Sequence, residues 1–263
     1  MNLQGLCILI TRPPSQSNKL AELIRGEGGE VVEFPTIEIT DPQDEGAIRR
    51  ALANVHFPAT WIFISPNAVT RALPYIQKAW TSLPKSIELI AVGEGTSHAL
   101  QARGFSTVNC PAKGQFNSEG VLALPSLQSI SGKQIVIFKG EGGRELLADS
   151  LRARGAFPIE INVYRRVLPN IDVDAILSST VRNNVSAVIV TSADSLKNLL
   201  ILVGEQHRLW LLSRRLIVSG ERLAQLAKEW GFVSSPLIAD NASDRSIIMA
   251  LSKWKTEILH EPR

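Results

Sequence analysis

The sequence predicts an α/β protein made of two doubly wound lobes, each with a parallel β-sheet covered by helices. Three observations predict this fold. Short apolar runs alternate with amphipathic segments, a set of landmarks recurs at one constant offset, and 263 residues suffice for two domains of ordinary size. A hydrophobic content of 44% beside 20% charged residues is typical of a globular protein.

Six short apolar runs, rich in β-branched residues, predict the central strands. Uninterrupted runs of this kind are buried on both faces, as in parallel sheets with helices on either side. A turn of small residues follows each run, which is the order expected of β–α units. The predicted strands are Cys7–Ile10, Trp61–Ile64, Leu89–Val92, Ile135–Phe138, Val185–Val190 and Leu216–Val218.

Seven amphipathic segments predict the helices between these strands. Several are followed by a glycine, among them Gly104, Gly155 and Gly231, and glycine often ends a helix because it adopts the left-handed conformation. The predicted helices are Ser17–Arg25, Ala68–Ala79, Thr96–Arg103, Arg144–Arg154, Ser195–Val203, Arg222–Trp230 and Ser246–Lys253.

A tandem repeat is predicted because a single offset in residue number, 192 minus 65 or 127, relates five pairs of landmarks. One such match carries little weight in an α/β protein, whereas a constant offset along most of the chain indicates a duplication. The pairs are Ile8 and Ile135, Gly28 and Gly155, Ser65 and Ser192, Gly93 and Gly220, and Gly104 and Gly231.

Two extended segments predict how the lobes are joined. Residues 31–40 and 159–167 follow the first helix of each half, and their alternating polar and apolar residues suit half-exposed strands. Such a pair predicts a two-stranded connector through which each half starts in one lobe and finishes in the other. The predicted division is residues 1–35 and 168–263 for lobe 1, 41–160 for lobe 2, and 36–40 and 161–167 for the connector.

Composition and motif content exclude several functional classes. The net charge is only +3, so we expect no nucleic-acid partner, although a local basic site for an acidic ligand remains open. Four histidines form no metal-ligand spacing, two cysteines form no disulfide framework, and a Gly-x-Ser-x-Gly nucleophile motif is missing. We therefore expect neither a metal nor a cofactor, and catalysis through positioning and electrostatics.

The chain also predicts a cytoplasmic location without a membrane partner. Its first residues lead into a strand and lack the charged and apolar regions of a signal peptide. No window contains the roughly 18 apolar residues that a membrane-spanning helix needs.

The turns after the predicted strands are the candidate binding site. They are rich in Ser, Thr and Gly, and the free N–H groups at helix N-termini bind anions such as carboxylates. Arg12 and Lys139 each follow a buried strand and are related by the repeat offset, which favours them among the cations. For any single Ser or Thr, the alternative to ligand binding is that its hydroxyl only caps the helix. The candidate binding residues are Arg12, Ser65, Asn67, Gly93, Lys139, Gly140, Arg144, Thr191, Ser192 and Gly220.

Taken together, these turns resemble those of the uroporphyrinogen-III synthase family over nearly the whole chain. The resemblance lies in the order and spacing of motifs that are individually weak. The motifs are Ile8–Pro13, Phe34–Ile39, Ile62–Val69, Ala91–Thr96, Lys139–Arg144, Val163–Arg166 and Val190–Ser192. The turn Ser219–Arg222 departs from the family pattern, because Glu221 brings a negative charge near an acidic ligand.

The resemblance implies two α/β lobes and a lyase reaction on hydroxymethylbilane. Loss of the ring A hydroxyl gives an electrophile, ring D attacks through its substituted carbon, and a spiro intermediate recloses with ring D inverted. Tyr164 matches the family tyrosine that assists loss of the hydroxyl, since a phenol can donate a proton or hydrogen bond, and Thr96 matches a hydroxyl residue at the same edge. We further expect a monomer, and the sequence leaves open a transient contact with the preceding enzyme of the pathway.

Two other functions remain open. A non-catalytic two-lobed protein that binds a small anion has a similar fold, but needs a tight cleft where a tetrapyrrole needs a wide one. A nucleotide-dependent α/β enzyme is the second alternative. Residues 139–144 are glycine-rich but lack both the Gly-Lys-Ser/Thr ending and the Gly-x-Gly-x-x-Gly spacing of phosphate loops.

Overall fold

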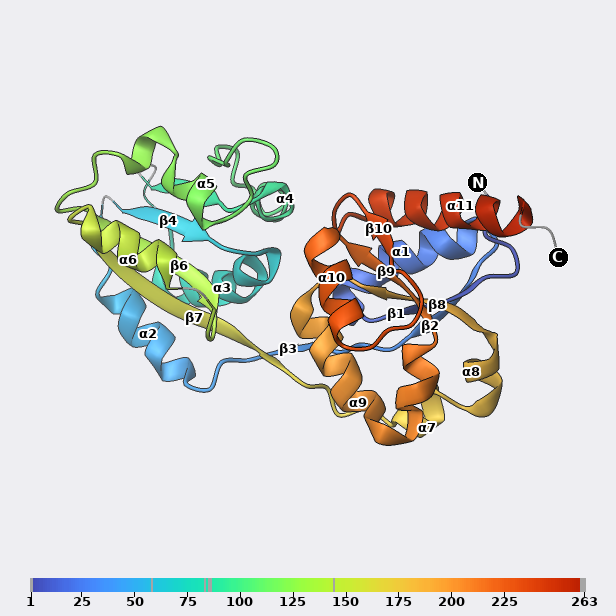
Figure 1. The fold of residues 1–263 in the computed structure, drawn as a ribbon. Helices are drawn as coiled ribbons and strands as arrows, with labels where there is room; N and C mark the ends of the chain where they lie inside the picture. The colour runs from blue at the N-terminus through green and yellow to red at the C-terminus, as the bar shows by residue number, and fades with distance from the viewer. Residues whose placement is uncertain (1, 58, 83, 85–86, 144, 261–263) are drawn as a thin grey trace. The chain divides into compact units, whose positions relative to one another are not determined.

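The computed structural model describes residues 2–57, 59–82, 84, 87–143 and 145–260. These residues divide into two compact units, each built on its own five-stranded sheet (Figure 1). Unit 1 comprises the described residues of Met1–Glu38 and Val167–Arg263, and unit 2 comprises those of Ile39–Arg166. The chain therefore leaves unit 1 once and returns to it once.

The sheet of unit 1 has the strand order β10-β9-β8-β1-β2, and the neighbouring strands run parallel. Its strands are β1 (Cys7–Ile10), β2 (Glu30–Glu33), β8 (Val185–Val190), β9 (Arg215–Ser219) and β10 (Leu237–Ala239). This order is that of a doubly wound sheet, in which ligands bind at the carboxyl ends of the strands.

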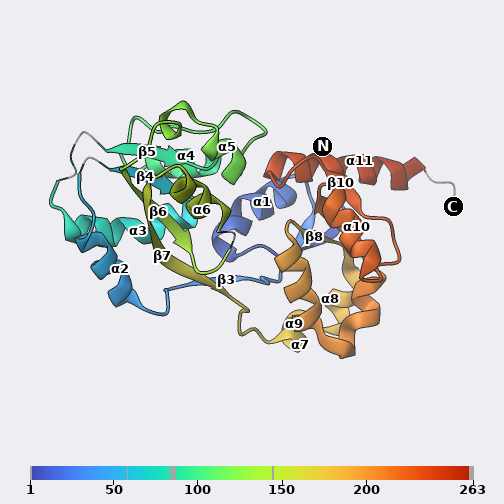
Figure 2. The ribbon, with the colours of Figure 1, turned by 60° about the vertical axis from the view of Figure 1, so that its left-hand side comes forward.

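Helices cover both faces of this sheet. Helices α1 and α11 pack on one face with residues such as Ile8 and Ile189, while α9 and α10 pack on the other with residues such as Leu9 and Val188. The helices of unit 1 are α1 (Pro14–Gly26), α7 (Val173–Ile176), α8 (Ser179–Asn184), α9 (Ala193–Leu212), α10 (Glu221–Glu229) and α11 (Asp244–His260). Figure 2 shows α9 and α11 in a second view.

The sheet of unit 2 has the strand order β3-β7-β6-β4-β5. Its strands are β3 (Glu38–Thr40), β4 (Thr60–Phe63), β5 (Glu88–Ala91), β6 (Gln134–Gly140) and β7 (Phe157–Val167). The pairs β7–β6, β6–β4 and β4–β5 are parallel. Strand β7 runs without interruption past residue 160, so the segment predicted as a connector continues a strand that pairs with β6 as far as Tyr164.

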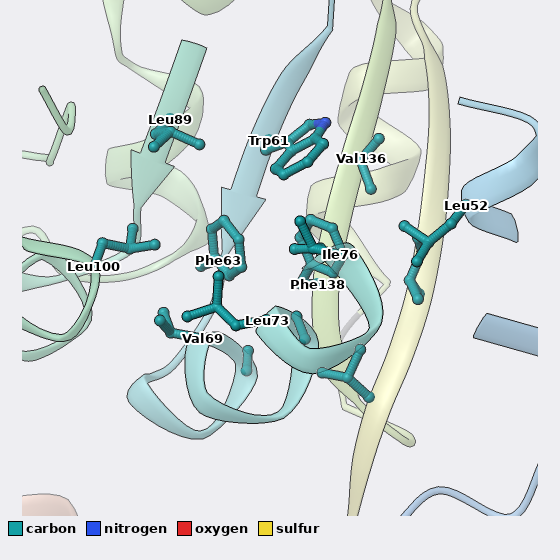
Figure 3. Close-up of a cluster of buried hydrophobic side chains, with 14 of the residues drawn as sticks. Leu52, Trp61, Phe63, Val69, Leu73, Ile76, Leu89, Leu100, Val136 and Phe138 are labelled. Atoms are coloured by element: carbon teal, nitrogen blue, oxygen red, sulfur yellow. The ribbon is translucent and has the colours of Figure 1, made fainter. Parts of the chain in front are cut away.

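The core of unit 2 follows from the alternation of side chains along its central strands. In β4, Trp61 and Phe63 face one side and Ile62 faces the other, so both faces are buried. Phe63 stacks on Phe138 of β6 at 4.6 Å between ring centroids, and Leu73 of α3 lies close to this cluster (Figure 3). Burying each such side chain contributes about 1.5–3 kcal/mol. The helices of unit 2 are α2 (Glu45–Ala53), α3 (Pro66–Ala79), α4 (Glu94–Gln101), α5 (Ser118–Leu122), the 3₁₀-helix η1 (Pro125–Leu127) and α6 (Leu146–Ala153).

Strand pairing in the two units is the same once the repeat offset is applied. Pairing of β1 with β2 begins at Cys7 opposite Glu30, and pairing of β6 with β7 begins at Gln134 opposite Phe157. The same offset relates the register of β4–β5 to that of β8–β9. In both units the strands therefore occupy equivalent positions, with β1, β2, β8 and β9 matching β6, β7, β4 and β5.

All seven predicted helices correspond to observed ones, with differences at their ends. The predicted end at Val203 falls just before Gly204, whose φ of 61° and ψ of −174° interrupt α9, although helix resumes beyond it. Helices α2, α5, α7 and α8 lie outside the predicted set, and the last three have only four to six residues. Among the described residues, no helix is both long and apolar enough to cross a bilayer.

Candidate active site

The predicted site residues lie at the carboxyl ends of strands in both units. Unit 2 contains Ser65, Asn67, Gly93, Thr96, Lys139, Gly140 and Tyr164. Unit 1 contains Arg12, Thr191, Ser192 and Gly220. Arg144 lies outside the described residues.

Tyr164 of β7 is completely buried against Gly140 of β6. The β6–β7 register shifts between Lys139 and Gly140, and this bulge places Gly140 opposite Tyr164. A Cβ atom at Gly140 would lie only 2.6 Å from Cε2 of the tyrosine ring. The tyrosine side chain has an exposed fraction of 0%, so Gly140 is required for the ring to pack where it does.

The hydroxyl of Tyr164 connects two polar side chains. It lies 3.1 Å from Oγ of Ser65 and accepts a hydrogen bond from Nη2 of Arg166 at 3.4 Å. The Arg166 guanidinium also lies 5.8 Å from the ring centroid, a cation–π distance. Because the phenol itself is buried, it reaches the surface of unit 2 only through these neighbours. The family resemblance implied a direct contact of Tyr164 with substrate, and in this conformation such a contact would require one of them to move.

Ser65 has a second contact at the start of α3. Its Oγ accepts a hydrogen bond from the backbone N–H of Ala68 at 3.1 Å, which makes Ser65 the N-cap of this helix. Asn67 lies half-buried in the first turn of the same helix. Capping and the contact with Tyr164 thus occur at one hydroxyl.

Gly93 and Thr96 begin α4. Gly93 is the N-cap, and a Cβ atom there would lie 3.3 Å from Cβ of Phe116. Phe116 therefore packs directly over the glycine backbone, although no sequence pattern had singled it out. Thr96 is buried, with an exposed fraction of 4%, and its N–H donates to the carbonyl of Gly93 at 3.0 Å.

Lys139 forms a small ion-pair network at the end of β6. Its Nζ lies 2.7 Å from Oε2 of Glu160, and Nη2 of Arg152 lies 3.1 Å from Oε1 of the same carboxylate. Burial on its own raises the pKa of Glu160, but hydrogen bonds and charges from Lys139 and Arg152 outweigh it and hold the pKa below its usual value. Glu160 is thus ionised at neutral pH.

Arg12, the equivalent cation in unit 1, is bound to protein groups. Nη1 donates to Oδ1 of Asp244 at 2.6 Å and to the carbonyl of Gln16 at 3.5 Å, and Nη2 donates to the carbonyl of Ala242. Only 8% of Arg12 is exposed. Its predicted role in ligand binding therefore competes with a structural role between β1 and the start of α11.

Thr191, Ser192 and Gly220 belong to a turn region with its own cavity in unit 1. Ser192 caps α9 by accepting from the N–H of Ser195 at 3.0 Å, and Gly220 begins α10 with a φ of 98°, a conformation that favours glycine. Thr191 and Ser192 line a cavity of about 490 Å³ together with Glu229, Arg222 and Gln225. The last two residues were not predicted as site residues, and the only signal for them in the sequence was their place in the turn after β9.

No group of three or more His, Cys, Asp or Glu side chains among the described residues is placed to hold a metal ion. The strand ends of each unit carry hydroxyls, amides, backbone N–H groups and cations, which suit an anionic organic ligand, beside carboxylates such as Glu160 and Glu221.

Comparison with known proteins gives one consistent family. Residues 18–248 match the family model described as "Uroporphyrinogen-III synthase HemD". The uroporphyrinogen-III synthase of Escherichia coli (strain K12) is 33% identical over 247 residues, which cover 94% of this chain and 100% of the relative. That of Synechococcus elongatus is 26% identical and covers 96% of each chain.

Solved structures share the fold at lower identity. A mutant uroporphyrinogen III synthase from Thermus thermophilus aligns with a TM-score of 0.60 and 17% identity, covering 97% of this chain and 100% of that chain. A uroporphyrinogen-III synthetase from Helicobacter pylori 26695 aligns with a TM-score of 0.57 and 18% identity, covering 94% and 99%. With a family match across most of its length and a full-length relative at 33% identity, the chain belongs to the uroporphyrinogen-III synthase family.

Proposed function

We propose that the chain converts hydroxymethylbilane to uroporphyrinogen III, as a lyase that removes water, closes the ring and inverts ring D. The observation that carries this proposal is the family match over residues 18–248. The composition of the strand ends supports it, because hydroxyls, free N–H groups and cations suit a substrate with many carboxylates.

Holding the substrate is the main chemical task in this proposal. The linear tetrapyrrole closes unaided to the isomer in which ring D is not inverted, so the protein must favour the sterically worse attack. Binding the substrate carboxylates at fixed positions achieves this through orientation rather than through a covalent intermediate. Loss of the hydroxyl then needs only a hydrogen-bond donor nearby.

In unit 2 we assign Tyr164 a positioning role. Its buried hydroxyl contacts Ser65 and Arg166, so it fixes two groups that are themselves closer to solvent. Arg166 then supplies a positive charge toward the leaving hydroxyl or a carboxylate, while Gly93, Asn67 and Thr96 shape the starts of α3 and α4. A direct contact between Tyr164 and the substrate requires Ser65 or Arg166 to move aside.

In unit 1 we assign substrate carboxylates to the cavity beside α9 and α10. Thr191, Ser192 and the backbone of Gly220 lie at the helix starts, and Arg222 adds a cation on the same wall. Arg222 offsets one negative charge at this cavity, whose surroundings include Glu221 at the start of α10 and Glu229 in the wall. Arg12 is assigned to structure instead, because three protein acceptors already surround its guanidinium.

A tandem duplication is our proposal for the origin of the two units. The matching strand registers support it, as do Gly28 and Gly155, which have φ values of 83° and 78° at the ends of equivalent helices. The proposed lobes, residues 1–35 with 168–263 and residues 41–160, then result from exchange of strands through the segments 36–40 and 161–167.

The working context of the enzyme follows from the chemistry of its sites and substrate. We propose that the enzyme works as a monomer. Both cysteines are free thiols, in keeping with the reducing cytoplasm.

Because the substrate closes unaided, a brief contact with the preceding enzyme would shorten its exposure to water. Light scattering tests the monomer, and isomer ratios in a coupled assay test the hand-over.

The direct test supplies freshly generated hydroxymethylbilane and separates the product isomers by chromatography. We expect the type III isomer in excess over the type I isomer that forms without protein. Type I alone, as in the blank, would overturn the proposal. Tight binding of a small anion without turnover would instead favour the two-lobed binding protein.

A further inference from the structure

We propose that a second cavity of unit 2, beside Lys139 and Asn117, is a subsite for one carboxylate side chain of the substrate, with Asn117 as a specificity-determining residue. The inference rests on the proposed function and deepens it, because neither Asn117 nor this cavity belonged to the predicted site. Its walls, its polar groups and its counterpart in unit 1 each support the assignment.

The cavity lies at the carboxyl ends of β4, β5 and β6 on the face covered by α5 and α6. It has a volume of about 250 Å³, and its walls include the aliphatic side chains of Ile64, Val92 and Leu147. Pockets for drug-sized ligands usually span about 300–1,000 Å³. This cavity is therefore sized for one side chain or one pyrrole unit of a larger ligand.

Asn117 and Lys139 offer free hydrogen-bond donors to the cavity. Oδ1 of Asn117 accepts a hydrogen bond from the N–H of Gly120 at 2.8 Å, so the side-chain oxygen is occupied and the NH₂ group is left as a donor. Among the described residues this NH₂ has no hydrogen-bond partner. Lys139, whose side chain is 11% exposed, contributes an ammonium group with three N–H donors, of which Glu160 takes one.

Glu160, the carboxylate in the cavity wall, is already satisfied. Its two oxygens accept from Lys139 and from Arg152, and Arg152 also donates to Oδ1 of Asp149 at 2.7 Å. The two cations and two carboxylates of this cluster balance, so the capacity for a further ligand lies in unused N–H donors. A ligand that brings a carboxylate can accept from the free donors of Lys139 and Asn117, whereas a cationic ligand offers them no acceptor.

The equivalent pair of residues in unit 1 supports the assignment, because there the cation is paired within the protein. The repeat offset relates Arg12 to Lys139, and it relates Asn117 to Asp244. In unit 1 these two positions form an ion pair at 2.6 Å, and the cation is satisfied by protein groups. In unit 2 a neutral amide stands where unit 1 has the carboxylate, so the cation keeps capacity for an external anion.

The test replaces Asn117 with residues that keep the cap and change the donors. Asn117→Asp retains an oxygen for the N–H of Gly120 but puts a negative charge in place of the amide. We expect its KM for hydroxymethylbilane to rise about tenfold or more, because a charged hydrogen bond is lost and a repulsive charge is gained. Asn117→Ser keeps the cap without the charge and should raise KM by less.

Two further variants keep the outcome clear. Asp244→Asn makes the mirror-image change in unit 1 and should leave KM unchanged while lowering the unfolding midpoint. If Asn117→Asp does not fold, Lys139→Gln serves instead and should also raise KM. A KM within twofold of wild type for a folded Asn117→Asp or Lys139→Gln protein that still forms the type III isomer overturns the subsite alone. A wild-type protein that yields only the type I isomer overturns the proposed function.

Discussion

Arg12 in unit 1 and Lys139 in unit 2 stand at the carboxyl ends of equivalent strands, but their partners differ. Arg12 has three acceptors, including the carboxylate of Asp244, and is almost fully covered. Lys139 shares a single carboxylate with Arg152 and lines a cavity. Two positions related by one offset can thus hold a structural cation in one unit and a binding cation in the other.

The same contrast extends to the strands that follow. Tyr164 in β7 corresponds by the offset to Ile37 of unit 1, so only unit 2 has a buried phenol at this place. The phenol ring packs against Gly140, where a side chain would collide with it, and its hydroxyl contacts Oγ of Ser65. The catalytic specialisation that we propose is therefore concentrated in unit 2, and variants in the two units can test that asymmetry.

The largest effect is expected for Gly140→Ala. The new methyl group would lie 2.6 Å from the Tyr164 ring, which has no free space because it is fully buried. We expect the free energy of unfolding to fall by about 3 kcal/mol and turnover to fall with it. Urea unfolding measures the first and the isomer assay the second. Gly26→Ala in α1 is the matched control, since a methyl group there would meet nothing within 4 Å, and its stability should stay the same or rise.

A smaller difference in the free energy of unfolding should separate Ser65→Ala from Ser192→Ala. Both serines cap helices at equivalent positions, so each loses about 1 kcal/mol of stability through the cap. Ser65→Ala also removes a partner of the buried Tyr164 hydroxyl, which adds about 1 kcal/mol. Unfolding free energies of the two variants provide the comparison. Equal losses would mean that the contact between Ser65 and Tyr164 contributes nothing.

Tyr164→Phe separates positioning from packing. The ring stays and only the hydroxyl is lost, so we expect stability to fall by no more than about 1 kcal/mol. Turnover should drop about tenfold, with KM changed less, because Ser65 and Arg166 lose the group that orients them. Steady-state kinetics provide the measurement. Wild-type turnover in a folded variant would return Tyr164 to a packing role.

The smallest effect concerns pH and Glu160. Because the folded-state pKa of Glu160 is lowered, its contribution to stability is present above the usual value of 4.5 and is lost as pH falls through the folded pKa. The side chain is partly exposed, so the contribution is below about 1 kcal/mol. Glu160→Gln should therefore be less stable than wild type near neutral pH, and this difference should shrink on acidification. A difference that is constant from neutral to acidic pH would contradict the ion-pair origin.

Local patterns in the sequence were sufficient for most strands and most helices, but not for the three-residue edge strand β10. Runs such as Ile135–Phe138 can be buried only in a covered sheet, and the glycines after helices mark left-handed turns, as the φ of 90° at Gly104 illustrates. Short helices such as α7 carry too few residues for a periodic pattern. Their positions depend on what packs against them.

The site was harder to predict because its contacts are long-range. Arg12 follows a buried strand just as Lys139 does. No local feature reveals that the carboxylate of Asp244, 232 residues away, binds its guanidinium group. The bulge that buries Tyr164 depends on the register of β6 against β7, which the alternation of residues does not encode. Asn117 was missed because an N-cap asparagine looks the same in sequence whether its amide is free or bonded.

The measurement that tests the proposed asymmetry most directly is the KM for hydroxymethylbilane of Lys139→Met beside Arg12→Met. We expect KM to rise about tenfold for Lys139→Met, since a charge-assisted contact with the substrate is lost. For Arg12→Met we expect an unchanged KM and a loss of about 3 kcal/mol in unfolding free energy, because Asp244 and the carbonyls of Gln16 and Ala242 all lose their donor. A raised KM for a folded Arg12→Met protein, with that of Lys139→Met unchanged, would contradict the account.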